Sequence, residues 1–215
     1  MAFDALVFDL DGTLWDTCPA CAVAWNEVLA RHSIEYRRIE PDDVRKVTGR
    51  PHEECIRLTF ADLSPSQIQI LVDDTTVEDG VAIERLGGEI YEGVEAGLRI
   101  LSEKYRLFIV SNCQSGYIET FLRLSGFGKF FDDFECWGNT GCPKSENLRR
   151  VIERNKLVSP VMVGDTPGDQ KAAIDCGIPF AFVSYGFQSC DAPEFSFDSF
   201  GGLVSQFMSS QETRL

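Results

Sequence analysis

The chain has 215 residues, enough for a substantial core and for one domain with a modest insert. Its formal net charge of −14 would repel a polyanion such as nucleic acid, and no apolar stretch reaches the length of a membrane span. The first residues show no basic segment and no cleavage-like site, so we expect no signal peptide. These features predict a soluble, cytoplasmic protein with no nucleic-acid and no membrane partner.

In chain order, four short apolar runs predict buried parallel strands, at residues 5–8, 107–110, 161–163 and 180–183. Helical patterns separate the later runs, at residues 93–104, 117–125, 145–155 and 168–176. This alternation predicts an α/β sheet with right-handed crossovers. Ligands of such sheets bind beyond the carboxyl ends of the strands, where polar or small residues follow each run.

Strand signals vanish between the first and second runs. Helical stretches follow one another there instead, at residues 19–31, 41–47, 52–63 and 65–86, with Gly and Pro breakers between them. We therefore predict an all-helical cap at residues 17–87, inserted into a core formed by residues 1–16 and 88–215. Gly87 and Gly88 would form a flexible joint between the two.

The eight cysteines are scattered, and without a secretory signal we expect reduced thiols. Cys18 and Cys21 are the one close pair, which alone could be redox-active or half of a zinc site. No second such pair completes a zinc site, and His32 and His52 are isolated. A redox motif in a βαβ unit would also follow an apolar strand directly. A structural role is therefore favoured over a redox role.

Two carboxylates, Asp9 and Asp11, follow the first strand just before Gly12 and can face one cavity. A calcium loop would need a Glu at its twelfth position, and counting from Asp9 that residue is Ala20. A turn with two incidental carboxylates remains possible, although packing them together is unfavourable without a cation. The pair therefore indicates a cation site.

Polar residues also follow the second and third strands. Ser111 and Asn112 offer a hydroxyl and a backbone N–H to a phosphate oxygen, although both residues are common in turns. Asp165 and Asp169 could be a helix cap and a first-turn acid, but that does not explain why this strand ends so much like the first. Lys144, at a predicted helix start, is either a surface charge or a cation for a phosphoryl group. Together these groups suit Mg²⁺ and a phosphate.

In this arrangement the sequence resembles the haloacid dehalogenase superfamily over nearly its whole length. The matching motifs, in order, are Asp9-Leu10-Asp11-Gly12-Thr13, Ser111, Lys144 and Gly164-Asp165 with Asp169. The position of the helical insert resembles the C1 cap of phosphoglycolate-phosphatase-like and β-phosphoglucomutase-like members. The resemblance implies a Rossmann-like parallel sheet core with an inserted all-helical cap.

The resemblance also implies catalytic roles. Asp9 would attack phosphorus, and Asp11 would protonate the leaving alcohol and then take a proton from the hydrolytic water. Ser111, the Asn112 N–H and Lys144 would hold the phosphoryl oxygens. Dehalogenase members lack an acid two residues after the nucleophile, so Asp11 favours phosphatase or phosphomutase chemistry.

For Mg²⁺, the implied ligands are the side chains of Asp9 and Asp165, the backbone carbonyl of Asp11, and Asp169 directly or through water. Selectivity should lie in the cap, because the core groups contact only phosphate and metal. There, Arg50 in the turn at residues 48–52 either clamps the leaving group or is an exposed turn residue, and the sequence favours neither.

The leading hypothesis is a Mg²⁺-dependent phosphatase that hydrolyses a small phosphorylated metabolite through an aspartyl-phosphate, acting as a monomer or homodimer. A sugar phosphomutase of the β-phosphoglucomutase type is the alternative within enzymes. A catalytically silent binding protein on the same fold is the alternative outside them, and it is disfavoured because no core catalytic position is lost.

Overall fold

The computed structural model describes residues 3–209. Its centre is a six-stranded sheet in the order β5-β4-β1-β6-β7-β8, in which every neighbouring pair is parallel. The strands are β1 (Ala5–Phe8), β4 (Arg106–Ser111), β5 (Asp133–Cys136), β6 (Pro160–Gly164), β7 (Phe180–Val183) and β8 (Phe195–Phe197). The β1 strand lies between β4 and β6, so its carboxyl end is central.

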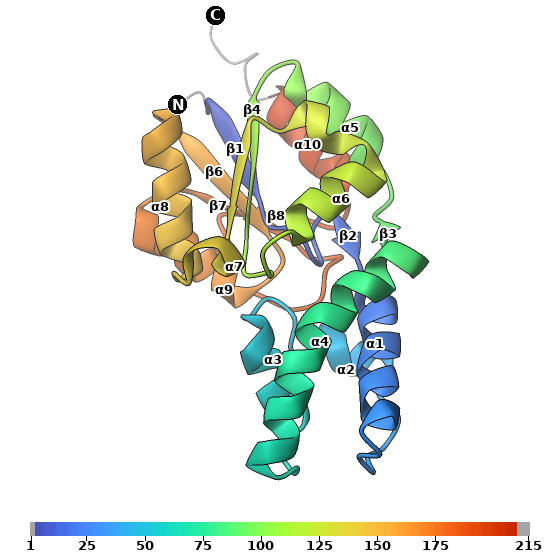
Figure 1. The fold of residues 1–215 in the computed structure, drawn as a ribbon. Coiled ribbons are helices and arrows are strands. Elements are labelled where there is room, and N and C mark those ends of the chain that lie inside the picture. The colour runs from blue at the N-terminus through green and yellow to red at the C-terminus, as the bar shows by residue number, and fades with distance from the viewer. Residues whose placement is uncertain (1–2, 210–215) are drawn as a thin grey trace, which may run out of the picture.

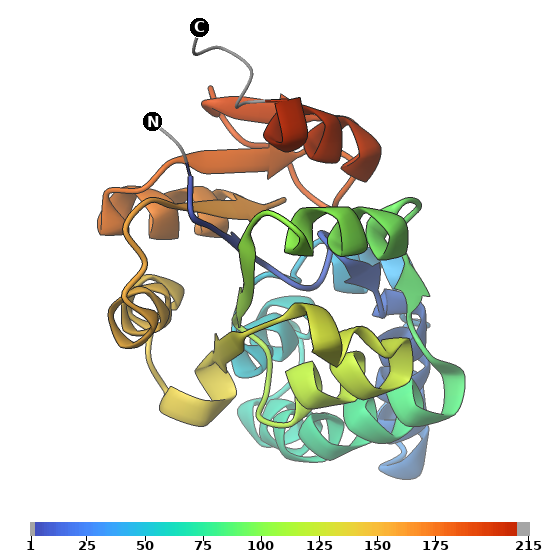
Figure 2. The same ribbon diagram turned by 90° about the horizontal axis from the view of Figure 1, so that it is seen from above.

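Helices cover both faces of the sheet (Figures 1 and 2). On one side lie α5 (Val94–Ser102), α6 (Tyr117–Ser125) and α10 (Phe200–Ser209), and on the other lie α8 (Lys144–Asn155) and α9 (Pro167–Cys176). Side chains alternate between the faces of a strand. Accordingly, Leu6 and Phe8 of β1 belong to one apolar cluster, and Ala5 and Val7 belong to the other. The fold is thus the predicted Rossmann-like α/β core.

Two strands of this six-stranded sheet, β5 and β8, were not predicted, because both lie at sheet edges and lack a continuous apolar run. Asp133 and Glu135 alternate with Phe134 and Cys136 in β5, and both acids pair with Arg154 of α8. The sequence analysis also omitted α10, the short helix α7 (Trp137–Thr140) and a 3₁₀ turn at Phe127–Phe130. The four central strands lie where the apolar runs predicted them, because burial on both faces is a strong signal.

Four helices form the cap below the sheet in Figure 1. They are α1 (Cys18–Arg31), α2 (Pro41–Arg45), α3 (His52–Thr59) and α4 (Pro65–Leu86). The two long helices α1 and α4 lie side by side, and α4 begins with a capping box in which Ser64 accepts from the Gln67 N–H. Among residues 3–209, none of the helices combines the length and apolar character that a membrane crossing needs.

A short antiparallel ribbon joins cap and core. It pairs β2 (Trp15–Asp16) with β3 (Glu89–Ile90). Between cap and ribbon, Gly87 has a φ of 77° and an added Cβ at Gly88 would lie 2.6 Å from the Trp15 ring, so both positions require glycine. The cap also contacts the core directly, because Asn112 Nδ2 donates to the Gly49 carbonyl at 2.8 Å and Gln188 Nε2 donates to the Thr48 carbonyl at 2.9 Å.

Candidate active site

Asp9 occupies the carboxyl end of the central strand. Its backbone N–H continues the sheet ladder by donating to the Val163 carbonyl at 2.8 Å, and only 1% of the residue is exposed. The Lys144 ammonium, at the first residue of α8, lies 2.7 Å from Asp9 Oδ1 and 2.6 Å from Asp169 Oδ1. The lysine is itself buried, so this one cation bridges two buried carboxylates rather than solvating a surface.

Asp165 and Asp169 follow β6 and complete the acidic group. Asp165 accepts from the Thr13 hydroxyl at 3.2 Å and from the Phe187 N–H at 2.7 Å. Asp169 is the N3 residue of a capping box on α9, so its Oδ2 accepts from the Thr166 N–H and hydroxyl. Both carboxylates are therefore held in one orientation by the backbone around them.

Glycines make room for these carboxylates. A Cβ at Gly12, whose φ is 82°, would lie 2.2 Å from Asp165 Oδ2, and one at Gly186 would lie 2.3 Å from Asp165 Cβ. A Cβ at Gly164 would lie 2.5 Å from Asp169 Cγ. Only glycine fits at such distances, so the backbone is shaped around the acidic group.

One carboxylate oxygen from each of Asp9, Asp165 and Asp169 lies within 4.8 Å of the others. Burial and the neighbouring acids raise the pKa of Asp9 to about 6 and raise the pKa of Asp165 well above its usual range, while the two carboxylates beside Lys144 raise its pKa. If all three acids ionise, they exceed the single ammonium by two negative charges. A divalent cation with oxygen ligands matches that excess, so the donor set fits Mg²⁺.

Asp11 points to a different set of partners. Its Oδ1 accepts from the Tyr117 hydroxyl at 2.6 Å and from the Thr17 hydroxyl at 3.3 Å. Burial raises its pKa to about 7, while the bond from Tyr117 counteracts that rise. At neutral pH this carboxyl can both give and accept a proton, which a general acid/base requires. The sequence analysis missed Tyr117, whose position at the start of α6 carries no motif.

A cavity of about 70 Å³ lies between the strand tips and the cap, and it is lined by Asp9, Asp11, Ser111 and Asn112 from the core. Arg50 lines it from the cap, but its guanidinium contacts Glu54 at 3.3 Å and the Val47 carbonyl at 3.2 Å. The structure thus brings the strand-tip residues to one place and puts Arg50 at the rim. The prediction that Arg50 binds substrate stays a prediction.

The cap side of this cavity contains two groups to which the sequence analysis gave no role in the site, Asp79 of α4, which is buried, and His52 of α3, whose side chain is 10% exposed. A signal for Asp79 exists in the sequence. It is spaced by helical repeats from Leu71, Thr75 and Ala82, so an acid lies on the buried stripe of α4. An acid at such a position is uncommon unless it has a partner.

Comparison with known proteins agrees with this fold. The family model described as haloacid dehalogenase-like hydrolase matches residues 6–183. The chain is 26% identical to a phosphoglycolate phosphatase of Vibrio parahaemolyticus over 93% of each chain. It is 30% identical to a plasmid-encoded phosphoglycolate phosphatase of Cupriavidus necator, over 88% of this chain and 84% of the relative.

Solved structures share the fold. A predicted phosphatase from Clostridium acetobutylicum superposes with a TM-score of 0.81 at 19% identity, covering 97% of this chain and 99% of the other. A predicted phosphoglycolate phosphatase from Haemophilus somnus gives 0.81 at 19% identity, covering 95% and 97%. The chain belongs to the haloacid dehalogenase-like hydrolase family. The relatives confirm the prediction of an enzyme of the phosphatase class.

Proposed function

We propose that this protein is a Mg²⁺-dependent phosphatase that transfers the phosphoryl group of a small phosphorylated metabolite to Asp9 and then to water. The observation that carries the proposal is the convergence of Asp9, Asp165 and Asp169 within 4.8 Å, with the Lys144 ammonium 2.7 Å from Asp9. A turn with incidental acids would not need a buried lysine beside it. Phosphoryl transfer depends on this kind of positioning and charge stabilisation.

In the first step Asp9 attacks phosphorus, and the P–O bond to the alcohol breaks. The leaving alkoxide takes a proton from Asp11, whose pKa of about 7 leaves it partly protonated at neutral pH. In the second step the ionised Asp11 removes a proton from a water molecule, which attacks phosphorus and releases Asp9 and inorganic phosphate. Tyr117 and Thr17 keep the Asp11 carboxyl in one place during both steps.

The proposed Mg²⁺ ligands are the side chains of Asp9 and Asp165 and the Asp11 carbonyl, with Asp169 direct or through water. The ion would neutralise charge as an anionic phosphate approaches an anionic nucleophile. Asp169 also fixes Lys144, through the 2.6 Å contact. The proposed phosphate ligands are the Lys144 ammonium, the Ser111 hydroxyl and the Asn112 N–H, at the tip of the neighbouring strand.

The thiols of Cys18 and Cys21 do not favour a redox function. Both lie in α1, and burial together with nearby acids raises the pKa of each thiol far above its ordinary value. A thiol that stays protonated is a poor nucleophile for disulfide exchange. The two residues therefore fit the structural role that the sequence predicts.

A panel of phosphorylated metabolites, with Mg²⁺ and after EDTA treatment, tests the proposal. We expect Mg²⁺-dependent release of inorganic phosphate from at least one small phosphomonoester and from p-nitrophenyl phosphate. Full activity in metal-free buffer would contradict the metal site. Conversion of a hexose 1-phosphate to the 6-phosphate without phosphate release would instead indicate the phosphomutase.

A further inference from the structure

A continuous chain of polar side chains lies on the cap side of the active-site cavity, and three of its members, Trp25, His52 and Asp79, line that cavity. Trp25 Nε1 donates to Asp79 Oδ1 at 3.0 Å, and Asp79 Oδ2 lies 3.3 Å from His52 Nδ1. The other ring nitrogen, His52 Nε2, lies 2.8 Å from the Thr75 hydroxyl, which donates to the Leu71 carbonyl at 2.5 Å. The chain thus links α1, α4 and α3 around one histidine and one acid.

The geometry of these hydrogen bonds bears on where the protons lie. The Thr75 hydroxyl has one hydrogen, and where it gives that hydrogen to Leu71 at 2.5 Å, His52 Nε2 is the donor to Thr75. If His52 carries only that proton, its Nδ1 is an acceptor facing an acceptor oxygen of Asp79. One more proton must therefore lie between Asp79 and His52, and the two residues, named here the Asp79–His52 pair, have no net charge.

Burial places that proton on the acid. Desolvation raises the pKa of Asp79 well above its usual range and lowers the pKa of His52 to about 4. Both directions favour a neutral carboxyl that donates to a neutral imidazole. The cap side of the cavity therefore offers hydrogen bonds without a formal charge.

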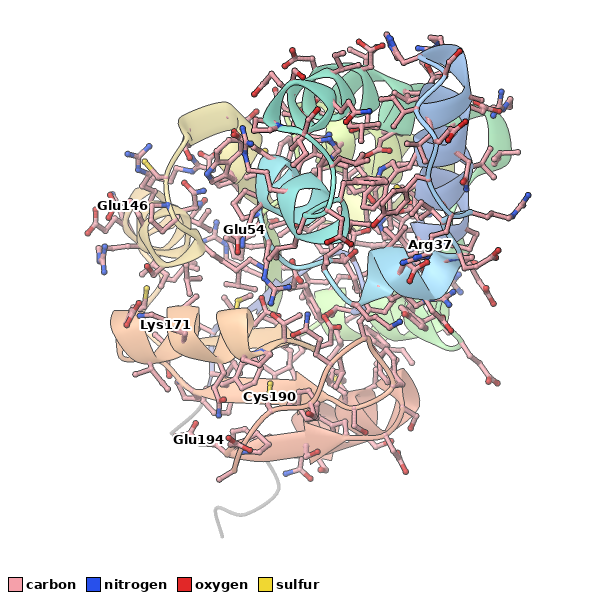
Figure 3. All side chains as sticks on the ribbon, turned by 90° about the horizontal axis from the view of Figure 1, so that it is seen from below. Arg37, Glu54, Glu146, Lys171, Cys190 and Glu194 are labelled. Carbon is pink, nitrogen blue, oxygen red and sulfur yellow. The ribbon has the colours of Figure 1, made fainter. Side chains whose placement is uncertain are left out.

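A carboxylate on the leaving group would find no free cation in this cavity. Among the described residues that line it, Arg50 has the only permanent positive charge, and that charge is paired with Glu54. Glu54 lies on α3 near the middle of the view from the cap end (Figure 3). The floor of the cavity carries Asp11. Burying an unpaired carboxylate there is strongly unfavourable.

A hydroxyl group would find partners. Asn112 Oδ1 is buried with no hydrogen-bond partner among the described residues, while its Nδ2 is occupied by the Gly49 carbonyl. Such an acceptor can take a hydrogen bond from the ligand, which a hydroxyl supplies and a carboxylate does not. Asn112 and the Asp79–His52 pair line the same cavity.

We propose that this cavity selects phosphomonoesters whose leaving alcohol is uncharged and carries a further hydroxyl, which is bound by Asn112 Oδ1 and by the Asp79 carboxyl that His52 positions. The inference rests on the proposed phosphatase function and names its substrate class. By this inference the chain does not prefer phosphoglycolate, the substrate named for its relatives, because glycolate has a carboxylate where this cavity has no free cation.

Four phosphate esters of the same two-carbon length test the inference: 2-hydroxyethyl phosphate, ethyl phosphate, 2-phosphoglycolate and phosphoethanolamine. They place a hydroxyl, nothing, a negative charge and a positive charge at the same end of the leaving group. We expect kcat/KM for 2-hydroxyethyl phosphate to exceed that for 2-phosphoglycolate about tenfold or more, and to exceed those for the other two esters. A highest value for 2-phosphoglycolate or for phosphoethanolamine would overturn the inference.

Hydrolysis of p-nitrophenyl phosphate separates this failure from failure of the proposed function. If the protein hydrolyses that substrate and prefers 2-phosphoglycolate, only the inference about the leaving group is wrong. If it hydrolyses none of the five esters, the proposed function is wrong.

Two variants test the Asp79–His52 pair itself. Asp79→Asn keeps the acceptor for Trp25, keeps a donor for His52 and has no charge, so the preference for hydroxyl over carboxylate should stay within about threefold of wild type. His52→Ala should reduce the ratio of kcat/KM between 2-hydroxyethyl and ethyl phosphate about tenfold, mainly through KM. A large gain of 2-phosphoglycolate activity in Asp79→Asn would show that Asp79 acts as a charged group, which contradicts the proposal.

The matched control is His32→Gln. His32 is the cap's other histidine, and it pairs with Asp74 outside the cavity. This variant should leave the ratio unchanged. An equal loss in His32→Gln and His52→Ala would overturn a specific role for His52.

Discussion

The core and the cap each bury acidic side chains, and they balance the charge of these side chains differently. In the core, Asp9, Asp165 and Asp169 are crowded against one another, and Lys144 supplies only part of the opposing charge. In the cap, Asp79 is buried beside His52 and shares one proton with it. A buried site with excess charge attracts ions, whereas a buried site with no net charge can select only through hydrogen bonds.

The difference assigns separate tasks to the two regions. The strand tips contact a metal ion and a phosphate group, which all substrates of such an enzyme share. The cap contacts the alcohol, which differs between substrates. Changes in the core should therefore alter the rate for every substrate, and changes in the cap should alter the ranking of substrates.

The largest expected effect comes from Asp9→Asn, which removes the nucleophile but keeps its size. We expect kcat to fall about 10³-fold or more for every substrate, with the far-UV circular dichroism spectrum unchanged. Steady-state release of inorganic phosphate measures the loss. Turnover within tenfold of wild type would contradict the nucleophile assignment.

Lys144→Met should reduce kcat/KM about 10²-fold for all substrates, because it removes the cation that contacts Asp9 and Asp169. It should also lower the free energy of unfolding in EDTA by about 3 kcal/mol, since two buried carboxylates lose their partner. Urea denaturation measures this second effect.

Lys171→Met is the control for Lys144→Met. Lys171 lies on α9 (Figure 3), is 73% exposed in its side chain and pairs with Asp175 at the surface. The change should leave both activity and stability nearly as in wild type. An equal loss in the two variants would contradict the role given to Lys144.

Tyr117→Phe should reduce kcat/KM for an alkyl phosphate about threefold to tenfold, because it frees the Asp11 carboxyl to move. The hydrogen bond from Tyr117 lowers the pKa of Asp11, so its loss raises that pKa above about 7. Asp11 must be protonated to give a proton to the leaving alcohol. The alkaline limb of the pH–rate profile should therefore move to higher pH, and a limb that stays or moves to lower pH would contradict the assignment.

The smallest effect concerns the pH dependence of stability in the cap. The pKa of Asp79 is raised in the folded state, so at a pH above the pKa of an unfolded aspartate the protein takes up a proton when it folds. The stability that Asp79 contributes is therefore lost as pH rises towards its folded-state pKa. Relative to Asp79→Asn, wild type should lose stability as pH rises from 5 to 6, by up to about 1.4 kcal/mol per pH unit.

Urea denaturation of both proteins at several pH values measures that difference. The pKa of His52 is lowered to about 4, so its contribution to the free energy of unfolding falls as pH falls through the same range. This contribution is the same in both proteins and cancels in the difference between them. A constant difference between pH 5 and 6 would mean that the folded pair holds no such proton, with Asp79 ionised beside a neutral His52.

Local patterns predicted the central strands and the residues at their tips, because topology brings the ends of parallel strands together wherever the crossovers run. They did not predict the edge strand at Asp133–Cys136, whose charged residues are stabilised by Arg154 from a different element. They also missed the contact of Asp79 with Trp25, because it depends on how two cap helices pack. Single residues on separate helices carry no shared spacing from which such a contact could be inferred.

The central claim is that Asp9 becomes phosphorylated during turnover. The most direct measurement is an acid quench of the enzyme with substrate and Mg²⁺, followed by borodeuteride reduction and peptide mass spectrometry, which converts an acyl phosphate of aspartate into labelled homoserine. We predict labelled homoserine at residue 9, dependent on both substrate and Mg²⁺. Label at another carboxylate such as Asp165, or label that appears without substrate, would contradict the account.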